Sequence, residues 1–424
     1  MHILIVCAGS AGDVHPFIAI ARALQQRGHA VELMTAAYFR ARVERAGIAF
    51  ISAAGPDTFE QILRDAELWH PRRAFGAVWR YVAASLPGTY AQIRRHVRPG
   101  ETVLVASTLA FAARLVQERN GVPMATVHLS PACLFSATDP PAWPGLSWLG
   151  GLPAWVVRAL IALVERLALD PVVLPALNGF RRDIGLAPVR SVMRRWLHSP
   201  QRVICAFPHW YAAAQSDWPP HTVATGFALL AAAEGEVMPA ALAAFLAAGP
   251  PPIAFTPGSA MAHGRAFWQR ALAACEAMGM RAILVTPFAD QLPPSLPPFA
   301  LHAAWVPFDL LAPRVAVFVH HGGIGTCAQV LAAGRPQLVT PFAHDQFDNA
   351  ARLTRLGVAA SVAHDAPLEQ WVAALSFLRD DAGTRDACAV MATRMAAGRA
   401  APEQIAGYIE ALADEAGSGP GHCA

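Results

Sequence analysis

The chain has 424 residues, 54% hydrophobic and 15% charged, so it is too long for one ordinary domain and too apolar for a disordered protein. Its net charge is +3 with neutral histidines, and no basic stretch is interleaved with aromatic residues, which excludes a typical nucleic-acid-binding protein. Seven cysteines without a CxxC pair argue against a disulfide framework or a zinc site, and a reducing cytosol fits them best.

Short apolar runs alternate with helical runs rich in alanine, leucine and arginine along the first half of the chain. The predicted strands there lie at 2–8, 30–35, 102–106, 125–129 and 202–207. Most of these runs are continuously apolar, which is typical of parallel strands covered by helices on both faces. The pattern predicts an α/β domain over residues 1–214.

The most apolar stretch of the chain, residues 149–177, is interrupted by Arg158, Glu165, Arg166 and Asp170. A membrane-spanning helix needs roughly 20 nearly uncharged residues, so this stretch predicts an apolar helix with one polar edge. Two interpretations stay open: a helix buried in the protein, or a surface that contacts lipid. The chain starts without the basic residues and cleavage site of a signal peptide. We therefore expect a cytoplasmic protein, which the second interpretation places against the inner face of the membrane.

A linker composition separates the two halves of the chain. Residues 215–252 contain Trp-Pro-Pro, an alanine-rich patch and Gly-Pro-Pro-Pro, which predicts a linker over 215–250. The strand–helix alternation then restarts, with predicted strands at 253–256, 282–286, 315–320 and 337–340. We predict a second α/β domain over 251–416 and a disordered tail over 417–424. Two doubly wound, Rossmann-like parallel sheets would then face each other across a cleft at the carboxyl ends of their strands.

The first glycine loop, residues 9–16, follows the first predicted strand and lacks the GxGxxG spacing of nicotinamide-dinucleotide proteins. Pro16 fits the first turn of a helix over 17–27, which places Asp13 just before the helix N-terminus. Asp13 is then either a helix cap or a general base that faces the cleft. A helix N-terminus keeps a carboxylate ionised, so such a base would act through its position rather than a high pKa.

Two further glycine loops follow strands in the second half. The loop with Gly258 and Ser259 is either an ordinary turn or an anion site that offers backbone N–H groups and a hydroxyl. The segment 320–326, with two histidines followed by Gly-Gly-Ile-Gly-Thr, precedes a helical run and predicts a phosphate site at the helix N-terminus. It is no P-loop, because GxxxxGK[ST] is missing. After the next strand, Asp345 and Gln346 form either a polar pair for sugar hydroxyls or a solvated loop.

Together these motifs resemble the family 1 glycosyltransferases, which have the two-domain GT-B fold. The resemblance is carried by 321–326, by Gly-Arg-Pro at 334–336, by Asp345-Gln346 with Asn349-Ala350, and by the loop 9–16 as it reads in the bacterial branch. Stretches such as 68–71, 196–200 and 215–219 look most like the catalytic rhamnosyltransferases of bacterial rhamnolipid synthesis. This similarity extends over nearly the whole chain.

The resemblance implies a role for each matching residue. Asp13 occupies the position of the general base, with His15 as the alternative. Ser259, with the backbone of Gly258, would support the donor diphosphate from the side opposite the 320–326 loop. Trp305 and Val306 would stack and pair the pyrimidine base, and Asp345 and Gln346 would hold the donor sugar. The remaining donor-binding positions are Gly12, His320, His321, Gly322, Gly323, Gly325, Thr326 and Gln329.

The resemblance also implies an inverting hexosyltransferase that needs no metal and no cofactor, since the nucleotide sugar is a co-substrate. Gln329 stands where many UDP-sugar enzymes carry a ribose-binding Glu, which favours a dTDP over a UDP donor. The resemblance implies dTDP-L-rhamnose as that donor. The implied acceptor is a lipophilic alcohol such as a 3-(3-hydroxyalkanoyloxy)alkanoate. Large aromatic residues of the first domain are candidates to line its pocket, or they pack in the core: Trp69, Phe75, Trp79, Phe135 and Trp143.

Three alternatives stay open. The protein is a UDP-glucosyltransferase for a small lipophilic alcohol, a sugar-nucleotide epimerase of the same shape, or a non-catalytic GT-B scaffold. Retention of Asp13, His321 and Asp345 argues against the scaffold. The partners expected are the nucleotide-sugar donor and the acceptor, and the sequence leaves the oligomeric state open.

Overall fold

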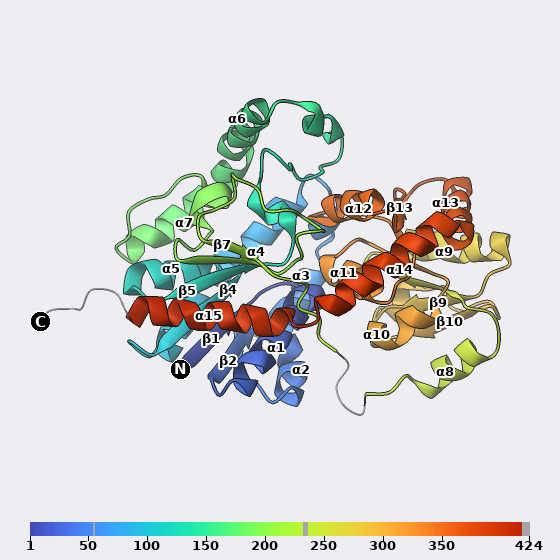
Figure 1. The fold of residues 1–424 in the computed structure, drawn as a ribbon, viewed down its shortest axis with the longest axis horizontal. Helices are drawn as coiled ribbons and strands as arrows, with labels where there is room; N and C mark the ends of the chain where they lie inside the picture. The colour runs from blue at the N-terminus through green and yellow to red at the C-terminus, as the bar shows by residue number, and fades with distance from the viewer. Residues whose placement is uncertain (54–55, 232–235, 418–424) are drawn as a thin grey trace, which may run out of the picture.

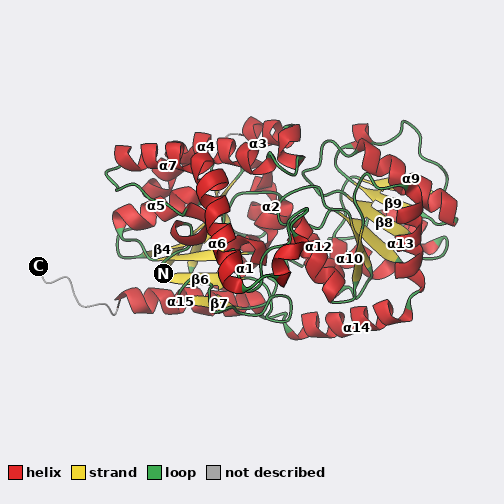
Figure 2. Cartoon of the chain, turned by 90° about the horizontal axis from the view of Figure 1, so that it is seen from above, coloured by secondary structure: helices red, strands yellow, loops and turns green. Residues whose placement is uncertain are grey.

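Residues 1–53, 56–231 and 236–417 are described by a computed structural model, in which they form two all-parallel sheets between layers of helices (Figure 1, Figure 2). The first sheet has the order β3 (Ala49–Ser52), β2 (Ala30–Thr35), β1 (His2–Val6), β4 (Thr102–Ser107), β5 (Met124–His128), β6 (Arg202–Cys205) and β7 (Thr222–Ala224). The second has the order β10 (Ala300–Ala303), β9 (Ala282–Val285), β8 (Ile253–Thr256), β11 (Val317–His320), β12 (Gln337–Val339) and β13 (Ala359–Ser361). The prediction of two doubly wound parallel sheets is confirmed.

Helices connect successive strands on both faces of each sheet. The first domain contains α1 (Ala11–Gln26), α2 (Arg40–Arg45), α3 (Pro56–Leu63), α4 (Ala74–His96), α5 (Phe111–Asn120), α6 (Ala154–Val164) and α7 (Asp170–Asp183). The second contains α8 (Ala240–Ala247), α9 (Arg265–Met278), α10 (Phe308–Leu311), α11 (Ile324–Ala332), α12 (Gln346–Arg355), α13 (Leu368–Asp380) and α14 (Ala382–Ala397). The last helix, α15 (Ala401–Gly417), leaves the second domain.

The inner strands of both sheets lie where the apolar runs predicted them. Every residue of β1, β4, β5, β8, β9 and β11 is buried, as expected for strands covered on both faces. The four strands without a sequence prediction, β3, β7, β10 and β13, are the edge strands of the two sheets. They are short and partly exposed, so they lack the continuous apolar run that identified the others.

The strand order reverses once in each sheet. In the first sheet the reversal lies between β1 and β4, and in the second it lies between β8 and β11. The loops that leave such neighbouring strands in opposite directions open a crevice at their carboxyl ends, where ligands of doubly wound sheets bind. The glycine loop 9–10 follows β1, the Gly258 loop follows β8, and the His321 loop follows β11.

The domain boundaries differ from the predicted ones at two places. The expected linker, 215–250, contains β7, which pairs with β6 in the first sheet, and α8, whose Leu242 is buried in the second domain. Residues 232–235 of this linker lie outside the described residues. The helix α15 returns to the first domain and packs against α1, with Ile405, Ile409 and Leu412 buried there (Figure 1). The predicted disordered tail, 417–424, begins at the last residue of α15, and residues 418–424 lie outside the described residues.

From Ala154 onward, the apolar stretch 149–177 lies in a continuous helical run of α6, the π-helical turn η5 (Glu165–Leu169) and α7. One side of this run is buried at Val157, Ile161 and Val173, whereas Trp155 and Leu167 on the other side are exposed. The helix is therefore not buried on all sides. Within the residues that the structure describes, no helix has the length and hydropathy that crossing a membrane requires.

Candidate active site

The loop after β1 turns directly into α1, and the helix begins at Ala11, six residues earlier than predicted. Ser10 is the residue before the helix, and both its backbone N–H (2.8 Å) and its hydroxyl (3.0 Å) donate to Asp13 Oδ2. Asp13 is therefore the third residue of α1 rather than its cap. Gly9, at φ 134°, leaves room for this arrangement, since a methyl group there would overlap the Asp13 side chain.

Burial changes the proton affinity of Asp13. It raises the pKa of Asp13 to about 6, against the opposing hydrogen bonds from Ser10 and with a further rise from the nearby Asp345 carboxylate. Desolvation thus outweighs the stabilisation of the carboxylate by the helix N-terminus, which we expected to dominate. At neutral pH this carboxyl group is mostly ionised, and it is a stronger base than an ordinary aspartate.

The corner between β11 and α11 is built around His320. Its Nδ1 accepts the Gly322 N–H at 3.0 Å, and its Nε2 donates to Gln337 Oε1 at 2.8 Å. Burial lowers the pKa of His320 to about 4, so the ring is neutral and both nitrogens are engaged within the fold. Gly322 turns the chain at φ 94°, where a methyl group would lie 2.8 Å from Val339 Cγ1. His320 therefore positions this corner.

His321 points into the space between two glycine loops. A methyl group on Gly258 would lie 2.8 Å from His321 Cε1, and one on Gly323 would overlap the same ring. The His321 Nδ1 atom is buried and has no hydrogen-bond partner among the described residues. Burial lowers the pKa of His321 to about 3, so the ring is neutral and keeps one N–H to donate. The predicted phosphate loops after β8 and β11 therefore meet at the sheet's topological switch point.

The segment after β12 supplies the second carboxylate of the site. Burial raises the pKa of Asp345, and the Asn349 amide, which donates to Asp345 Oδ2 at 2.9 Å, opposes the rise. The same Asn349 Nδ2 donates to Gly322 O at 2.9 Å, which ties this segment to the His321 corner. Gln346 uses its Oε1 to accept the N–H groups of residues 342 and 343 at 2.8 and 3.0 Å, so only its amide nitrogen remains for a ligand.

The first turns of α1 and α11 meet across the domain boundary. A methyl group on Gly325 would lie 3.1 Å from Gly12 Cα and 3.3 Å from Gly12 O. This close approach brings Asp13 of the first domain into electrostatic contact with Asp345 of the second. The sequence predicted each loop separately, and the tertiary structure joins the expected base to the expected donor site.

The expected nucleobase site lies at the rim of the second domain. Trp305 is 48% exposed, whereas the Val306 side chain is buried in the domain core. The Arg42 guanidinium of the first domain lies 5.3 Å from the Trp305 ring centroid and pairs with Glu236 at 2.7 Å. Burial and Arg42 lower the pKa of His15 to about 4, which makes His15 a weak base. Ser259 is exposed, and Thr326 and Gln329 are partly exposed on α11.

The expected acceptor residues separate into two groups. Trp79 is buried in the first domain's core, where its ring centroid lies 5.1 Å from that of Phe111. Phe75 packs against the same core. Phe135 and Trp143 lie 6.0 Å apart in the loop between β5 and α6. Trp69 contacts His344 of the second domain at 5.9 Å, and its buried indole nitrogen has no partner among the described residues. The structure therefore brings Phe135 and Trp143 together and encloses Trp79.

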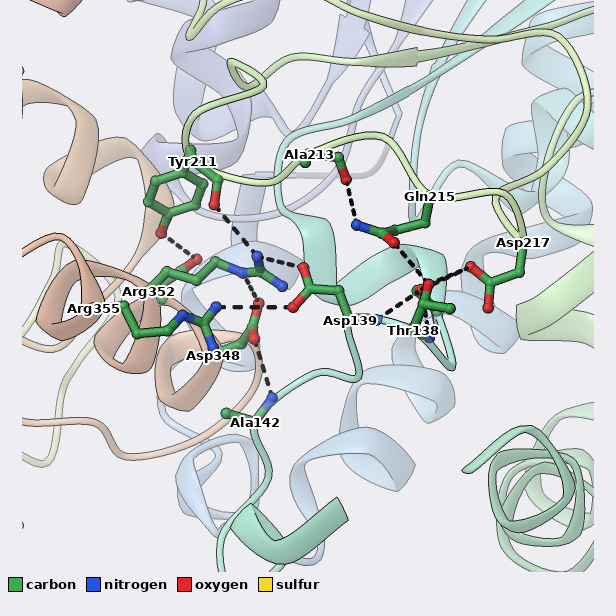
Figure 3. Close-up of polar contacts among 12 residues, drawn as sticks. Thr138, Asp139, Ala142, Tyr211, Ala213, Gln215, Asp217, Asp348, Arg352 and Arg355 are labelled. Carbon is green, nitrogen blue, oxygen red and sulfur yellow. Dashed lines mark hydrogen bonds and ion pairs between the residues drawn. The ribbon is translucent and has the colours of Figure 1, made fainter. Parts of the chain in front are cut away.

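Sequence reasoning missed a polar network across the boundary. Arg352 of α12 pairs with Asp348 at 2.8 Å and with Asp139 of the first domain at 2.7 Å (Figure 3). The Tyr211 hydroxyl donates to Asn349 Oδ1 at 3.0 Å, which links the first domain to the residue that holds Asp345. No motif signals the two pairs that cross the boundary, Tyr211–Asn349 and Arg352–Asp139, because their partners are separated by 138 or more residues.

Comparisons with known proteins agree with this geometry. Residues 3–137 match the glycosyltransferase family 28 N-terminal domain, and residues 280–412 match the C-terminal domain of erythromycin biosynthesis protein CIII-like proteins. The chain is 30% identical over 381 residues to O-mycaminosyltylonolide 6-deoxyallosyltransferase of Streptomyces fradiae, with 85% of each chain covered. The chain is a GT-B glycosyltransferase. It belongs to the group that includes the macrolide and antibiotic glycosyltransferases.

Further relatives of this glycosyltransferase match most of its length. It is 28% identical to the vancomycin aglycone glucosyltransferase of Amycolatopsis orientalis, with 87% of each chain covered. Among solved structures, the glycosyltransferase of kitacinnamycin has a TM-score of 0.73 at 21% identity, covering 97% of this chain and 98% of that one. The spinosyn rhamnosyltransferase SpnG in complex with thymidine diphosphate has a TM-score of 0.68 at 20% identity, covering 97% and 100%. These likenesses confirm the predicted GT-B fold and the prediction of an enzyme.

Proposed function

We propose that this glycosyltransferase transfers a hexose with inversion, from dTDP-L-rhamnose to the hydroxyl of a lipophilic acceptor such as a 3-(3-hydroxyalkanoyloxy)alkanoate. The observation that carries the proposal is the meeting of α1 and α11 at Gly12 and Gly325. It brings a buried carboxylate with a pKa raised to about 6 to a corner that offers a neutral imidazole and a helix N-terminus. An inverting transfer needs a base on one side of the anomeric carbon and a site for the leaving diphosphate on the other.

The residues then take the following roles. Asp13 removes the proton of the acceptor hydroxyl as that oxygen bonds to the anomeric carbon, and the proton stays on Asp13. The bond from the anomeric carbon to the diphosphate oxygen breaks, and dTDP leaves with its electron pair. The His321 N–H and the first-turn N–H groups of α11 stabilise the growing negative charge, and one such donor is worth about 3–4 kcal/mol in related oxyanion sites. Asp345 accepts hydrogen bonds from the sugar hydroxyls, and Trp305 stacks on the thymine.

Two observations support the donor. Gln329 offers an amide where a carboxylate would hold a ribose 2′-hydroxyl, and a deoxyribose does not need that contact. The structurally similar SpnG is a rhamnosyltransferase with bound thymidine diphosphate. Phe135 and Trp143 support a lipophilic acceptor, because their rings lie together in the loop that also carries Asp139. Two relatives are named for antibiotic acceptors, a tylonolide and the vancomycin aglycone, so a macrolide aglycone belongs among the acceptors to be tested.

A UDP-glucosyltransferase for a small lipophilic alcohol is the second candidate. The 28% identity to a glucosyltransferase favours it, and an amide at Gln329 can also accept a hydrogen bond from a ribose hydroxyl.

A matrix of donors and acceptors, read by product mass, tests the proposal. The donors are dTDP-L-rhamnose, dTDP-glucose and UDP-glucose, and the acceptors are a 3-(3-hydroxyalkanoyloxy)alkanoate, a free 3-hydroxy fatty acid and a macrolide aglycone. We expect the O-rhamnoside of the first acceptor to form fastest. Turnover of UDP-glucose without any turnover of dTDP-L-rhamnose would reject the donor, and transfer to the macrolide alone would reject the acceptor. Nucleotide release in the absence of acceptor would point to an epimerase.

A further inference from the structure

Large apolar side chains are exposed together along the outer side of the helical run α6–η5–α7. Trp155 is 72% exposed and Leu167 is 66% exposed. Trp155, Ala159, Leu163 and Leu167 follow one another at intervals of four residues, which places them on one stripe of the helix. Figure 1 shows α6 at the top of the molecule, above the sheet of the first domain. We define the outer face of α6 by these exposed residues: Trp155, Arg158, Leu163, Val164, Arg166 and Leu167.

The two acidic residues of the stretch do not belong to this face. Glu165 is buried and accepts the Arg194 N–H at 3.0 Å and the Arg194 Nε–H at 2.7 Å. Asp170 is buried and accepts the N–H groups of Ser191 and Val192 at 3.1 and 3.3 Å. Both carboxylates therefore point toward the 191–194 segment. Arg158 and Arg166 remain exposed beside the apolar stripe, so the charge of the outer face is positive.

The inner side of the same helix has a different role. Val157 and Ile161 pack against Ala137, with Phe135 and Trp143 beside them. The helix is thus fixed to the domain through one side and presents tryptophan, leucine and arginine on the other. A helix with an apolar stripe flanked by cations, too interrupted by charge to cross a bilayer, is the type that lies in the headgroup region of a membrane. Tryptophan is enriched at that depth, and arginine pairs with the phosphates of anionic lipids.

We propose that the outer face of α6 docks the protein on the surface of an anionic lipid bilayer. Trp155, Leu163 and Leu167 enter the headgroup region, and Arg158 and Arg166 pair with lipid phosphates. The positive charge selects an anionic bilayer rather than a neutral one. This docking does not depend on which sugar is transferred or to which acceptor.

Sedimentation of the full chain with vesicles tests the docking. The vesicles are pure phosphatidylcholine or an equimolar mixture with phosphatidylglycerol, at low and at high salt. We expect binding to the anionic vesicles, weakened by salt. Arg158→Gln with Arg166→Gln should lower the partition coefficient about 30-fold, because each arginine near an anionic surface contributes about 1 kcal/mol. Trp155→Ser with Leu167→Gln should lower it at least about tenfold.

The matched control is Phe377→Ser with Val390→Gln, because both are exposed apolar residues of the second domain. We expect this control to bind like wild type, and thermal unfolding to confirm that all three variants fold. Equal binding of wild type to both vesicle types, or an equal loss in the control, would overturn the proposal. Sedimentation velocity tests the other possible occupant of this face, a second copy of the chain. If wild type does not bind vesicles and forms a dimer that Trp155→Ser with Leu167→Gln dissociates, the proposal is overturned and the face is a dimer interface.

Discussion

Arg352 and Asp139 form an ion pair across the domain boundary, with Nη1 2.7 Å from Oδ2. Arg352 also pairs with the buried Asp348, whose Oδ1 accepts the Ala142 N–H at 3.1 Å (Figure 3). The loop of the first domain that carries Trp143 is thus held to α12, the helix that begins beside Asp345. This relationship connects the expected acceptor loop to the expected donor site.

The first prediction concerns this ion pair. Asp139→Asn should lower the free energy of unfolding by about 1–3 kcal/mol, because a hydrogen bond to a charged partner is lost at a mostly buried arginine. We expect the acceptor KM to rise more than the donor KM, since the affected loop carries Phe135 and Trp143. Chemical denaturation and initial rates measure the two effects.

The control for this prediction is Arg355→Gln. Arg355 lies 3.9 Å from Asp139 and its side chain is 60% exposed, so its loss should cost no more than about 0.5 kcal/mol. Equal effects of the two substitutions would show that Arg352 does not hold the loop through Asp139.

The second prediction uses the contact between the two helix N-termini. Gly325→Ala places a methyl group 3.1 Å from Gly12 Cα and 3.3 Å from Gly12 O. Both of these Gly12 atoms are backbone, so α1 and α11 must move apart to make room. We expect kcat/KM to fall about tenfold, because a small misplacement of the base relative to the donor is costly. Gly12→Ala is the matched control, since its nearest neighbours would lie at 3.8 and 3.9 Å. It should leave the two helices in contact and gain up to about 1 kcal/mol of stability from helix propensity, whereas Gly325→Ala should lower the stability. An equal loss of stability in both variants, measured by thermal unfolding, would contradict the close contact at Gly325.

The third prediction separates two adjacent histidines. His321→Ala should raise the Kd for dTDP about 10- to 100-fold, because a hydrogen bond to a charged phosphate is lost. Its effect on stability should be no more than about 1 kcal/mol, since the ring makes no hydrogen bond through Nδ1. His320→Ala should instead cost about 2–4 kcal/mol of stability, because it removes the bonds to Gln337 and to the Gly322 N–H. Calorimetric titration measures the Kd for dTDP, and thermal unfolding measures the stability. If His320→Ala weakened dTDP binding and His321→Ala lowered the stability, the roles of the two histidines would be exchanged.

The fourth prediction concerns catalysis by Asp13. Asp13→Asn should lower kcat by about 10³-fold while the Kd for dTDP changes less than about twofold, because only the proton transfer is lost. In wild type, kcat/KM should rise with pH and level off above about 6, where the carboxyl group is ionised. Turnover of the variant at the wild-type rate would remove Asp13 from the mechanism.

The fifth prediction follows from the same pKa and concerns stability. The pKa of Asp13 is raised from 3.8 to about 6, so the folded state favours the protonated form. Its stabilising contribution is present below pH 3.8 and is lost as the pH rises through about 6. Asp13→Asn should therefore raise the free energy of unfolding at pH 7.5 by about 1–3 kcal/mol and leave it unchanged near pH 3.5. Denaturation at the two pH values measures the difference, and a destabilised variant at pH 7.5 would show that the bonds from Ser10 outweigh burial.

Much of the interior was predictable from local pattern. The strands β2 and β8 begin and end where their apolar runs do, and the His321 and Gly258 loops follow buried strands as expected. The start of α1 was wrong by six residues, because a proline is usual in the first turn of a helix, whereas Pro16 lies in the second turn and leaves Gly12 O without its N–H partner from residue 16. The edge strands β3 and β7 carry too few buried residues to produce a pattern.

The sequence by itself determined what depends on neighbours along the chain: the α/β class, the central strands and the glycine turns. The same turns carry the resemblance to the glycosyltransferases. Only the tertiary structure decided which distant groups meet. The contact of Gly12 with Gly325, the raised pKa of Asp13 and the inward turn of Glu165 all depend on surfaces far apart in sequence. Burial and electrostatics act through space, so no local pattern records them.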